Sequence, residues 1–303
     1  MKTVSYEFSE NNNSTTSNES PFFIKDETSE LAMIFRVIAG SCQITNLNTE
    51  TTEPLSINYF FSDLRLNPEG NLTFLNLFEE GLKLTDYEDQ IKKTAYKNRK
   101  FYKNFLTELA SCIYHENTNR HTAAFVHLYR AYEHLSYAFP MIYAARTEDY
   151  VGTFENLRKW MNKANSDENV GELKFHKNFI ATLFKDTPEI QTTIEIEINT
   201  KQEFRPAIFK ALTEKIAGWD TPEKYSPGTV SPDKIAIPFI DHHSFLVNLR
   251  NRFFHYSNAR SDNIGLDDII EADLLFSFIN KTTLNYIATV FHGLVKHQMQ
   301  FRL

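Results

Sequence analysis

Long hydrophobic runs and glycine are both scarce in this chain of 303 residues. No segment reaches the roughly 18 uninterrupted apolar residues that a membrane-spanning helix needs. The first residues, Met-Lys-Thr-Val-Ser-Tyr-Glu, contain no apolar core of a secretory signal. Only nine glycines occur, and none of them forms a glycine-rich phosphate loop. These absences predict a cytoplasmic protein without membrane contact.

Cysteine is almost missing as well. Cys42 and Cys112 are too few for a disulfide framework and are not spaced as zinc ligands, which indicates a reducing compartment. Six histidines could suggest a metal site, but none forms a His-Glu-x-x-His pair, and His127 with His134, seven residues apart, are better explained as a helical stripe. The six are His115, His121, His127, His134, His242 and His243. We therefore expect no metal and no other cofactor.

An excess of positive charge is also absent. The formal net charge is −7, from 32 Lys and Arg against 39 Asp and Glu. A protein that coats nucleic acid would be basic, so any contact with nucleic acid must be local. This balance favours an enzyme that visits a strand over a packaging protein.

The N-terminal part divides into two predicted segments. Residues 8–20 hold almost nothing that fills a core, so we expect a disordered tail over 1–20. Residues 21–83 are expected to form a small α+β region. Within it, 30–39 is either a short helix capped at Gly40 or a buried strand. The turn sequence Asn-Pro-Glu-Gly at 67–70 predicts a β-hairpin between 55–66 and 71–77.

From residue 84 the apolar residues recur at helical spacing, which predicts a mainly α fold with a helical domain over 84–303. A strand with one wet face is predicted at 193–198, and an exposed Pro-rich connection at 220–238. The expected helices are 86–115, 120–145 with a kink or an end at Pro140, 151–164, 172–184, 204–219, a helix from Asp241 or Ser244, and 267–297.

One stretch near the C-terminus concentrates polar groups that can do chemistry. Arg250, Asn251 and His255 lie within two helical turns, and the apolar residues around them follow a helical rhythm. We therefore expect these three polar groups on a buried helix, where idle polar groups are costly.

An arginine followed by a polar residue and then a histidine resembles the signature of the HEPN superfamily (higher eukaryotes and prokaryotes nucleotide-binding). Here the motif occupies 250–255, and the run 122–135 is similar to the Tyr-Arg-x-x-Glu helix near the start of such domains. The resemblance covers the helical part from about residue 85. It implies a HEPN-like helical bundle, a homodimer with one composite cleft, and a ribonuclease of toxin or anti-phage (abortive infection) systems.

The spacing constrains how the motif works. Five residues along a helix place two side chains roughly 140° apart, so Arg250 and His255 do not meet simply by being close in sequence. Asn251 and His255 share a face. Arg250 can swing its long side chain toward that face, or the helix can be irregular, or two copies can pool their side chains across a two-fold axis. The last arrangement is what the resemblance implies. Histidine can take or give a proton, arginine can stabilise the charge on phosphorus, and Asn251 would orient the imidazole or the ribose. No divalent ion is required.

Further candidates for contact with RNA lie beside the motif. Arg252 lies three residues before His255 and either reaches the cleft or forms a surface salt bridge. Tyr256 either stacks on a base or packs against a neighbouring helix.

Other candidates lie earlier in the chain. Arg130 and Glu133 lie three residues apart on one helical face, where they can form an ordinary intrahelical ion pair. The resemblance instead implies that Glu133 supports the motif or faces the cleft. Lys97, Arg99 and Lys100 belong to a run of cations with interleaved aromatics, which suits a strand with stacked bases. The same run is also what a solvated helix face looks like.

An alternative function is a non-catalytic HEPN-like module that binds a nucleotide or a protein partner and keeps the motif for dimer packing. A chance match in a structural helical protein is a third, weaker interpretation. An antitoxin or activating partner fits the first hypothesis. Neither the RNA that is cut nor the role of 21–83 follows from the sequence.

Overall fold

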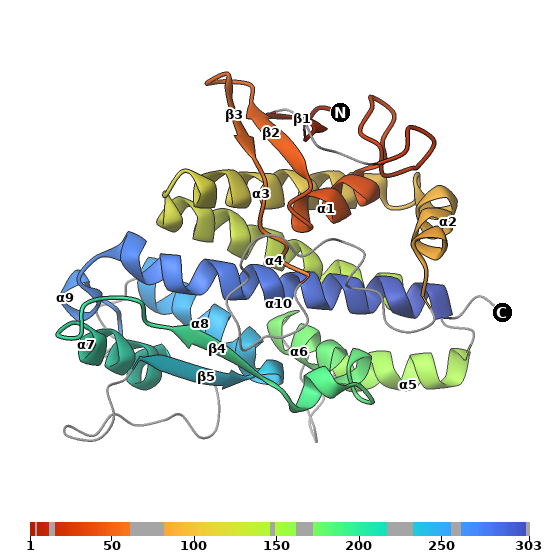
Figure 1. Ribbon diagram of the computed structural model, residues 1–303. Helices are drawn as coiled ribbons and strands as arrows, with labels where there is room; N and C mark the ends of the chain where they lie inside the picture. Colours follow the sequence, from red (N-terminus) through yellow and green to blue (C-terminus); the bar gives the residue numbers. More distant parts are fainter. Residues whose placement is uncertain are drawn as a thin grey trace. The chain divides into compact units, whose positions relative to one another are not determined.

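The computed structural model describes residues 1–3, 5–11, 16–60, 82–145, 149–161, 172–216, 233–255 and 262–300 (Figure 1). They form a mainly helical protein with a small antiparallel sheet in the N-terminal part, as the sequence predicted. The described residues fall into two compact units. Unit 1 takes residues up to 60, 82–135 and 287–300, and unit 2 takes those from 136 to 286.

A three-stranded sheet opens unit 1. Strands β1 (Tyr6–Glu10), β2 (Cys42–Asn46) and β3 (Thr51–Pro54) pair antiparallel in the order β1-β2-β3. The prediction of a disordered tail is therefore wrong for residues 6–10. Alternate residues of β1, Tyr6 and Phe8, are buried and hold the strand. The polar residues that follow dominate the composition of this segment, which is why the strand was not predicted.

The segment that periodicity left undecided is helix α1 (Glu30–Ile38), whose residues are all buried. Ser29 begins the helix and accepts a hydrogen bond from the amide of Ala32. Gly40 follows the end with φ +62°, and a Cβ there would collide with the backbone of Ile57. A strand is excluded because Ser29 and Gly40 supply the two ends that a helix needs.

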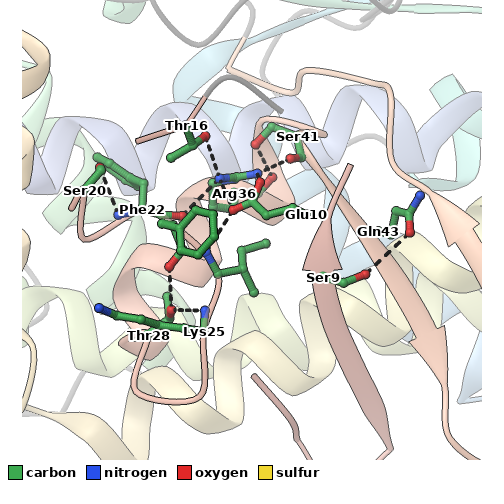
Figure 2. Close-up of polar contacts among 12 residues, drawn as sticks. Ser9, Glu10, Thr16, Ser20, Phe22, Lys25, Thr28, Arg36, Ser41 and Gln43 are labelled. Carbon is green, nitrogen blue, oxygen red and sulfur yellow. Dashed lines mark hydrogen bonds and ion pairs between the residues drawn. The ribbon is translucent and has the colours of Figure 1, made fainter. Parts of the chain in front are cut away.

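The guanidinium of Arg36 ties the N-terminal segment to α1 (Figure 2). Both Nη atoms donate to the carboxylate of Glu10, at 3.1 and 2.7 Å. Nη1 also donates to Thr16 Oγ1 at 3.1 Å and to the carbonyl oxygen of Phe22 at 3.0 Å, and Nη2 donates to the carbonyl oxygen of Ser41. One buried cation thus joins β1, the loop behind it and the end of α1.

The helix predicted over 86–115 is two helices, α2 (Leu84–Thr94) and α3 (Arg99–Asn117). Asn98 lies between them with φ +56°, a left-handed conformation that asparagine tolerates better than most residues. In Figure 1 the two helices run in different directions on either side of this turn. Residues 55–60 form no strand, and the rest of the predicted hairpin lies outside the described residues.

Helix α4 (His121–Ala144) passes through Pro140. The predicted alternative, an end of the helix near Phe139, is therefore wrong. Proline at position 140 cannot donate to the Ser136 carbonyl one turn earlier. The helix nevertheless continues past this missing hydrogen bond to Ala144.

In unit 2, α5 (Tyr150–Met161) packs against α6 (Glu172–Leu183). Trp160 lies between them, with its ring edge-on to Phe175 and Phe179. Both helices were predicted within three residues of these bounds. The predicted strand is confirmed as β4 (Thr193–Glu197), with Ile194 and Ile196 buried.

Strand β5 (Lys234–Pro238) pairs antiparallel with β4, so the exposed connection predicted at 220–238 is wrong for its last five residues. Ile235 and Ile237 are buried on the same period of two as in β4. Pro238 stands at the end of the strand, where a missing N–H costs little. Residues 220–232 of that connection lie outside the described part.

Helical turns complete unit 2. A 3₁₀ turn at Pro188–Gln191 precedes β4, and α7 (Arg205–Lys210) continues as a π-helix at Ala211–Ile216. Another 3₁₀ turn, Phe239–Asp241, leads into α8 (His242–Phe254). The last predicted helix is divided into α9 (Leu266–Ile269) and α10 (Ala272–Gln300). Ile270 interrupts it with φ +70°, which no pattern of apolar residues reveals.

Within the described ranges, none of the helices combines the length and the apolar character needed to cross a membrane.

Candidate functional site

Helix α8 carries the motif on its last turns. Its first half is held by buried Phe245, Leu246 and Leu249, while the ring of Phe253 meets Phe276 edge-on at 5.0 Å. Arg250 and Asn251 are only partly buried, and His255 is exposed. The expectation of a buried polar trio is therefore wrong, because the apolar stripe ends before the motif does.

The structure brings Arg250 and Asn251 together. Nη1 of Arg250 donates to Oδ1 of Asn251 at 3.0 Å. His255 is the residue at which α8 ends, with φ −110° and ψ 69°. Among the described residues no hydrogen bond joins His255 to either of them, and its imidazole remains open to solvent.

Arg252 binds residues that follow His255 in the chain. Its guanidinium forms an ion pair with Asp262, and its carbonyl accepts from the amide of Ile264 at 3.1 Å. Lys215 then holds Asn263 O and Asp268 Oδ2, at 2.9 and 2.6 Å. The salt-bridge alternative for Arg252 is the one observed. Tyr256 lies outside the described residues.

Replacing Asp262 with asparagine is expected to lower the free energy of unfolding by about 1 kcal/mol, because a partly buried guanidinium loses its charged partner. Urea unfolding at pH 7 measures the change. Asp267→Asn is the matched control, since Asp267 is exposed nearby. Equal midpoints for the two variants would mean that the ion pair does not hold this segment.

Arg130 and Glu133 lie on the part of α4 that belongs to unit 1, whereas the motif belongs to unit 2. Arg130 Nη2 contacts Glu108 Oε1 of α3 at 2.8 Å, so its ion pair joins two helices and is not the intrahelical pair with Glu133. Glu133 is exposed.

The basic run lies at the junction of α2 and α3 in unit 1. Arg99 Nε donates to the buried carboxylate of Glu30 at 2.9 Å and is thereby engaged within the protein. Lys97 and Lys100 are exposed.

A constellation that the sequence analysis missed bridges α3 and α4. Glu108 Oε2 contacts Nδ1 of His127 at 2.8 Å, and Glu116 Oε2 contacts Nδ1 of His121 at 2.9 Å. His115 stacks on His127 with ring centroids 5.4 Å apart. The signal was present: two glutamates eight residues apart face two histidines six residues apart across a tight turn, which pairs them in antiparallel order. Metal-ligand spacing alone does not reveal this pairing.

These carboxylates have a chemical consequence. Burial raises the pKa of Glu108, but the hydrogen bond from His127 and the charge of Arg130 outweigh it, so the pKa is lowered and Glu108 stays ionised. An ionised carboxylate only accepts, so Nδ1 of His127 carries the proton and Nε2 is left as the basic atom. The same arrangement orients histidines that act as acids and bases. His127 is partly exposed, which leaves Nε2 available.

A second group of imidazoles lies in the core of unit 2. His176 and His243 lie with ring centroids 5.6 Å apart, and Nε2 of His242 contacts Thr283 Oγ1 at 3.2 Å. Burial together with the charge of His243 lowers the pKa of His242 to about 3, and burial together with Lys177 lowers that of His243 to about 4. These rings stay neutral near pH 7.

Neither metal nor thiol chemistry is supported where the chain is described. No group of three or more His, Cys, Asp or Glu side chains is placed there to hold a metal ion. Cys42 and Cys112 are buried free thiols. Burial raises the pKa of Cys42 to about 12 and that of Cys112 well above its ordinary value, so neither is a reactive thiolate.

Comparison with protein-family models, with curated proteins and with solved structures finds no match for this chain.

Proposed function

We propose that this chain is a metal-independent endoribonuclease of the HEPN type, with Arg250, Asn251 and His255 as its catalytic residues. One observation carries the proposal: α8 buries its apolar half and ends in a turn where a guanidinium, an amide and a solvent-open imidazole follow one another. A polar cluster at an exposed helix end is accessible to a large substrate, whereas a buried one is not.

The chemistry requires three groups at the scissile phosphate. One imidazole takes the proton of the 2′-hydroxyl as O2′ attacks phosphorus, and the bond from phosphorus to O5′ breaks. A protonated imidazole gives its proton to O5′. Arginine stabilises the negative charge that grows on the phosphoryl oxygens. The products are a 2′,3′-cyclic phosphate and a 5′-hydroxyl.

Two copies of the chain fit this requirement better than one. Within a single chain Arg250 donates to Asn251 and His255 contacts neither of them. A homodimer that pools two motifs supplies both imidazoles, one as base and one as acid. We propose a toxin or anti-phage (abortive infection) effector of the cytoplasm as the biological role, controlled by an antitoxin or an activating partner.

Cleavage of total cellular RNA in the presence of EDTA tests the proposal. Arg250→Ala and His255→Asn are each expected to lower the initial rate at least about 100-fold, because each removes a group that acts in the transition state. Both side chains lie on the surface or near it, so the melting temperature should change little. Cyclic phosphate ends on the products would confirm the route.

His127→Asn provides the matched control, because it removes a partly exposed, carboxylate-oriented imidazole elsewhere in the chain. Full activity of this variant supports the assignment to α8. Parental rates in both motif variants, with activity lost in His127→Asn, would move the site to α3 and α4.

The hydrogen bond between Arg250 and Asn251 also favours a second candidate, a non-catalytic HEPN-like module that binds a nucleotide or a protein partner. In that case the guanidinium is already satisfied and serves packing. Intact RNA after incubation with the parent protein, together with a higher melting temperature on adding one nucleotide, would support this candidate.

A further inference from the structure

The junction of α2 and α3 is a strongly positive surface in an acidic protein. Between residues 92 and 103 the chain has six cations and no acid, although its net charge is −7. The five lysines are all exposed, and no described residue engages their ammonium groups. They are Lys92, Lys93, Lys97, Lys100 and Lys103. We call this set, together with Tyr96, the lysine strip.

The sixth cation behaves differently. Arg99 is bound to the carboxylate of Glu30, which is buried in α1. That pair is electrically balanced and serves the packing of α3 on α1. The structure thus separates one structural cation from five whose charge faces only solvent.

The aromatics of the same run separate in the same way. Tyr102 is buried, and the ring of Phe101 stacks parallel to that of Phe105 at 6.2 Å. Tyr96 is 81% exposed, the largest exposure among the large hydrophobic side chains of the described residues. Packing within the protein therefore accounts for two aromatics and leaves one ring on the surface among the lysines.

The backbone arranges these groups on both sides of Tyr96. Lys92 and Lys93 lie in the last turn of α2, and Lys97 belongs to the connecting turn that ends at Asn98. Lys100 and Lys103 lie three residues apart on one face of α3. The exposed ring thus stands between two groups of cations.

The position of these cations costs the helix stability. The first turn of α3 contains no acidic residue and begins with Arg99 and Lys100, so positive charge lies at the positive end of the helix dipole. A merely solvated face would do better with glutamate there. Helix stability therefore does not account for the charge of Lys100.

We propose that the lysine strip binds single-stranded RNA, with Tyr96 stacked on a base and the lysines on the flanking phosphates. Stacking requires an unpaired base, which a duplex does not offer. A membrane surface is disfavoured because the strip presents one aromatic ring and no apolar face. The proposal rests on the proposed function and identifies where the substrate gains affinity, apart from the α8 motif that cleaves it.

Binding is tested with the full chain and a labelled single-stranded RNA of about 12 nucleotides whose riboses are 2′-O-methylated, so that cleavage cannot occur. Fluorescence anisotropy gives the affinity between about 50 and 200 mM salt. Lys97→Gln with Lys100→Gln should reduce the slope of log affinity against log salt by about 1.4, since each phosphate contact on a single strand contributes about 0.7.

Tyr96→Ala should weaken binding by about 5- to 150-fold with the salt slope unchanged, and Tyr96→Phe should retain the affinity. Arg99→Gln is the control in the same stretch of chain but outside the lysine strip, and its salt slope should stay parental because Glu30 already neutralises that cation. Melting temperatures check that each variant is folded.

A parental salt slope in the double lysine variant would overturn the proposal, as would equal affinity for a duplex of the same length. Full affinity in Tyr96→Ala would overturn the stacking. The probe resists cleavage, so these outcomes do not depend on whether His255 is catalytic. If His255→Asn still binds RNA while the parent shows no cleavage, the proposal for the lysine strip is supported and the proposed nuclease activity is refuted.

Discussion

Replacing Arg36 with methionine is expected to lower the free energy of unfolding by about 3–5 kcal/mol. The guanidinium is nearly buried, and it is the partner of a carboxylate whose side chain is only 18% exposed. Methionine fills much of the same volume but leaves the mostly buried carboxylate of Glu10 without its cationic partner. The carbonyls of Phe22 and Ser41 lose a donor at the same time.

Urea unfolding followed by far-UV circular dichroism measures this loss at pH 7. Lys25→Met is the matched control, because Lys25 is an exposed cation in the same segment and should change stability by less than about 0.5 kcal/mol. Adding Glu10→Leu to Arg36→Met should recover part of the loss, since the unpaired charge is then gone. Similar midpoints for Arg36→Met and Lys25→Met would show that Arg36 does not hold the N-terminal segment to α1.

Acidification to pH 5 is expected to destabilise unit 2 by about 2 kcal/mol for each of His242 and His243. Their pKa values in the fold, about 3 and about 4, lie below the ordinary value of 6.5 because burial disfavours the charged ring. The folded state therefore holds fewer protons than the unfolded state in this window. The stabilisation is complete above about pH 6.5 and is lost as the pH falls toward 4.

Neutral groups and one cation lie against these two rings. His243 faces His176 and the cation of Lys177, which is itself paired with Asp241 at 2.6 Å. His242 faces Thr283 and the ring of Tyr286. Burial, with Lys177 beside His243 and His243 beside His242, therefore disfavours the charged form of both rings.

Urea midpoints at pH 7.5 and pH 5, read from tryptophan fluorescence, test this dependence. His243→Gln should be less stable than the parent at pH 7.5 and show a smaller loss on acidification. His255→Gln is the control on an exposed histidine and should keep the parental dependence. An unchanged loss in His243→Gln would show that other groups drive the acid sensitivity.

Periodicity predicted the regular elements well where a single stripe of apolar residues decides the structure. Helices α5 and α6 and strand β4 follow their patterns closely. The breaks at Asn98 and Ile270 were missed because a positive φ at one residue leaves the spacing of apolar residues intact. Strand β5 was missed because the prolines before it suggested a connection, whereas the residues it pairs with lie 37 to 45 positions earlier in the chain.

The candidate sites divide along the same line. The spacing of Arg250, Asn251 and His255 and the charge of the lysine strip are properties of adjacent residues, so the sequence alone determined them. Which cations are already neutralised was decided only by tertiary structure. Arg99 with Glu30, Arg130 with Glu108 and Arg252 with Asp262 are pairs of this kind.

The same holds for the paired glutamates and histidines of α3 and α4 and for the exposure of Tyr96. The physical reason is that a side chain's charge and periodicity are local, while its partner and its contact with solvent depend on which distant segments fold against it.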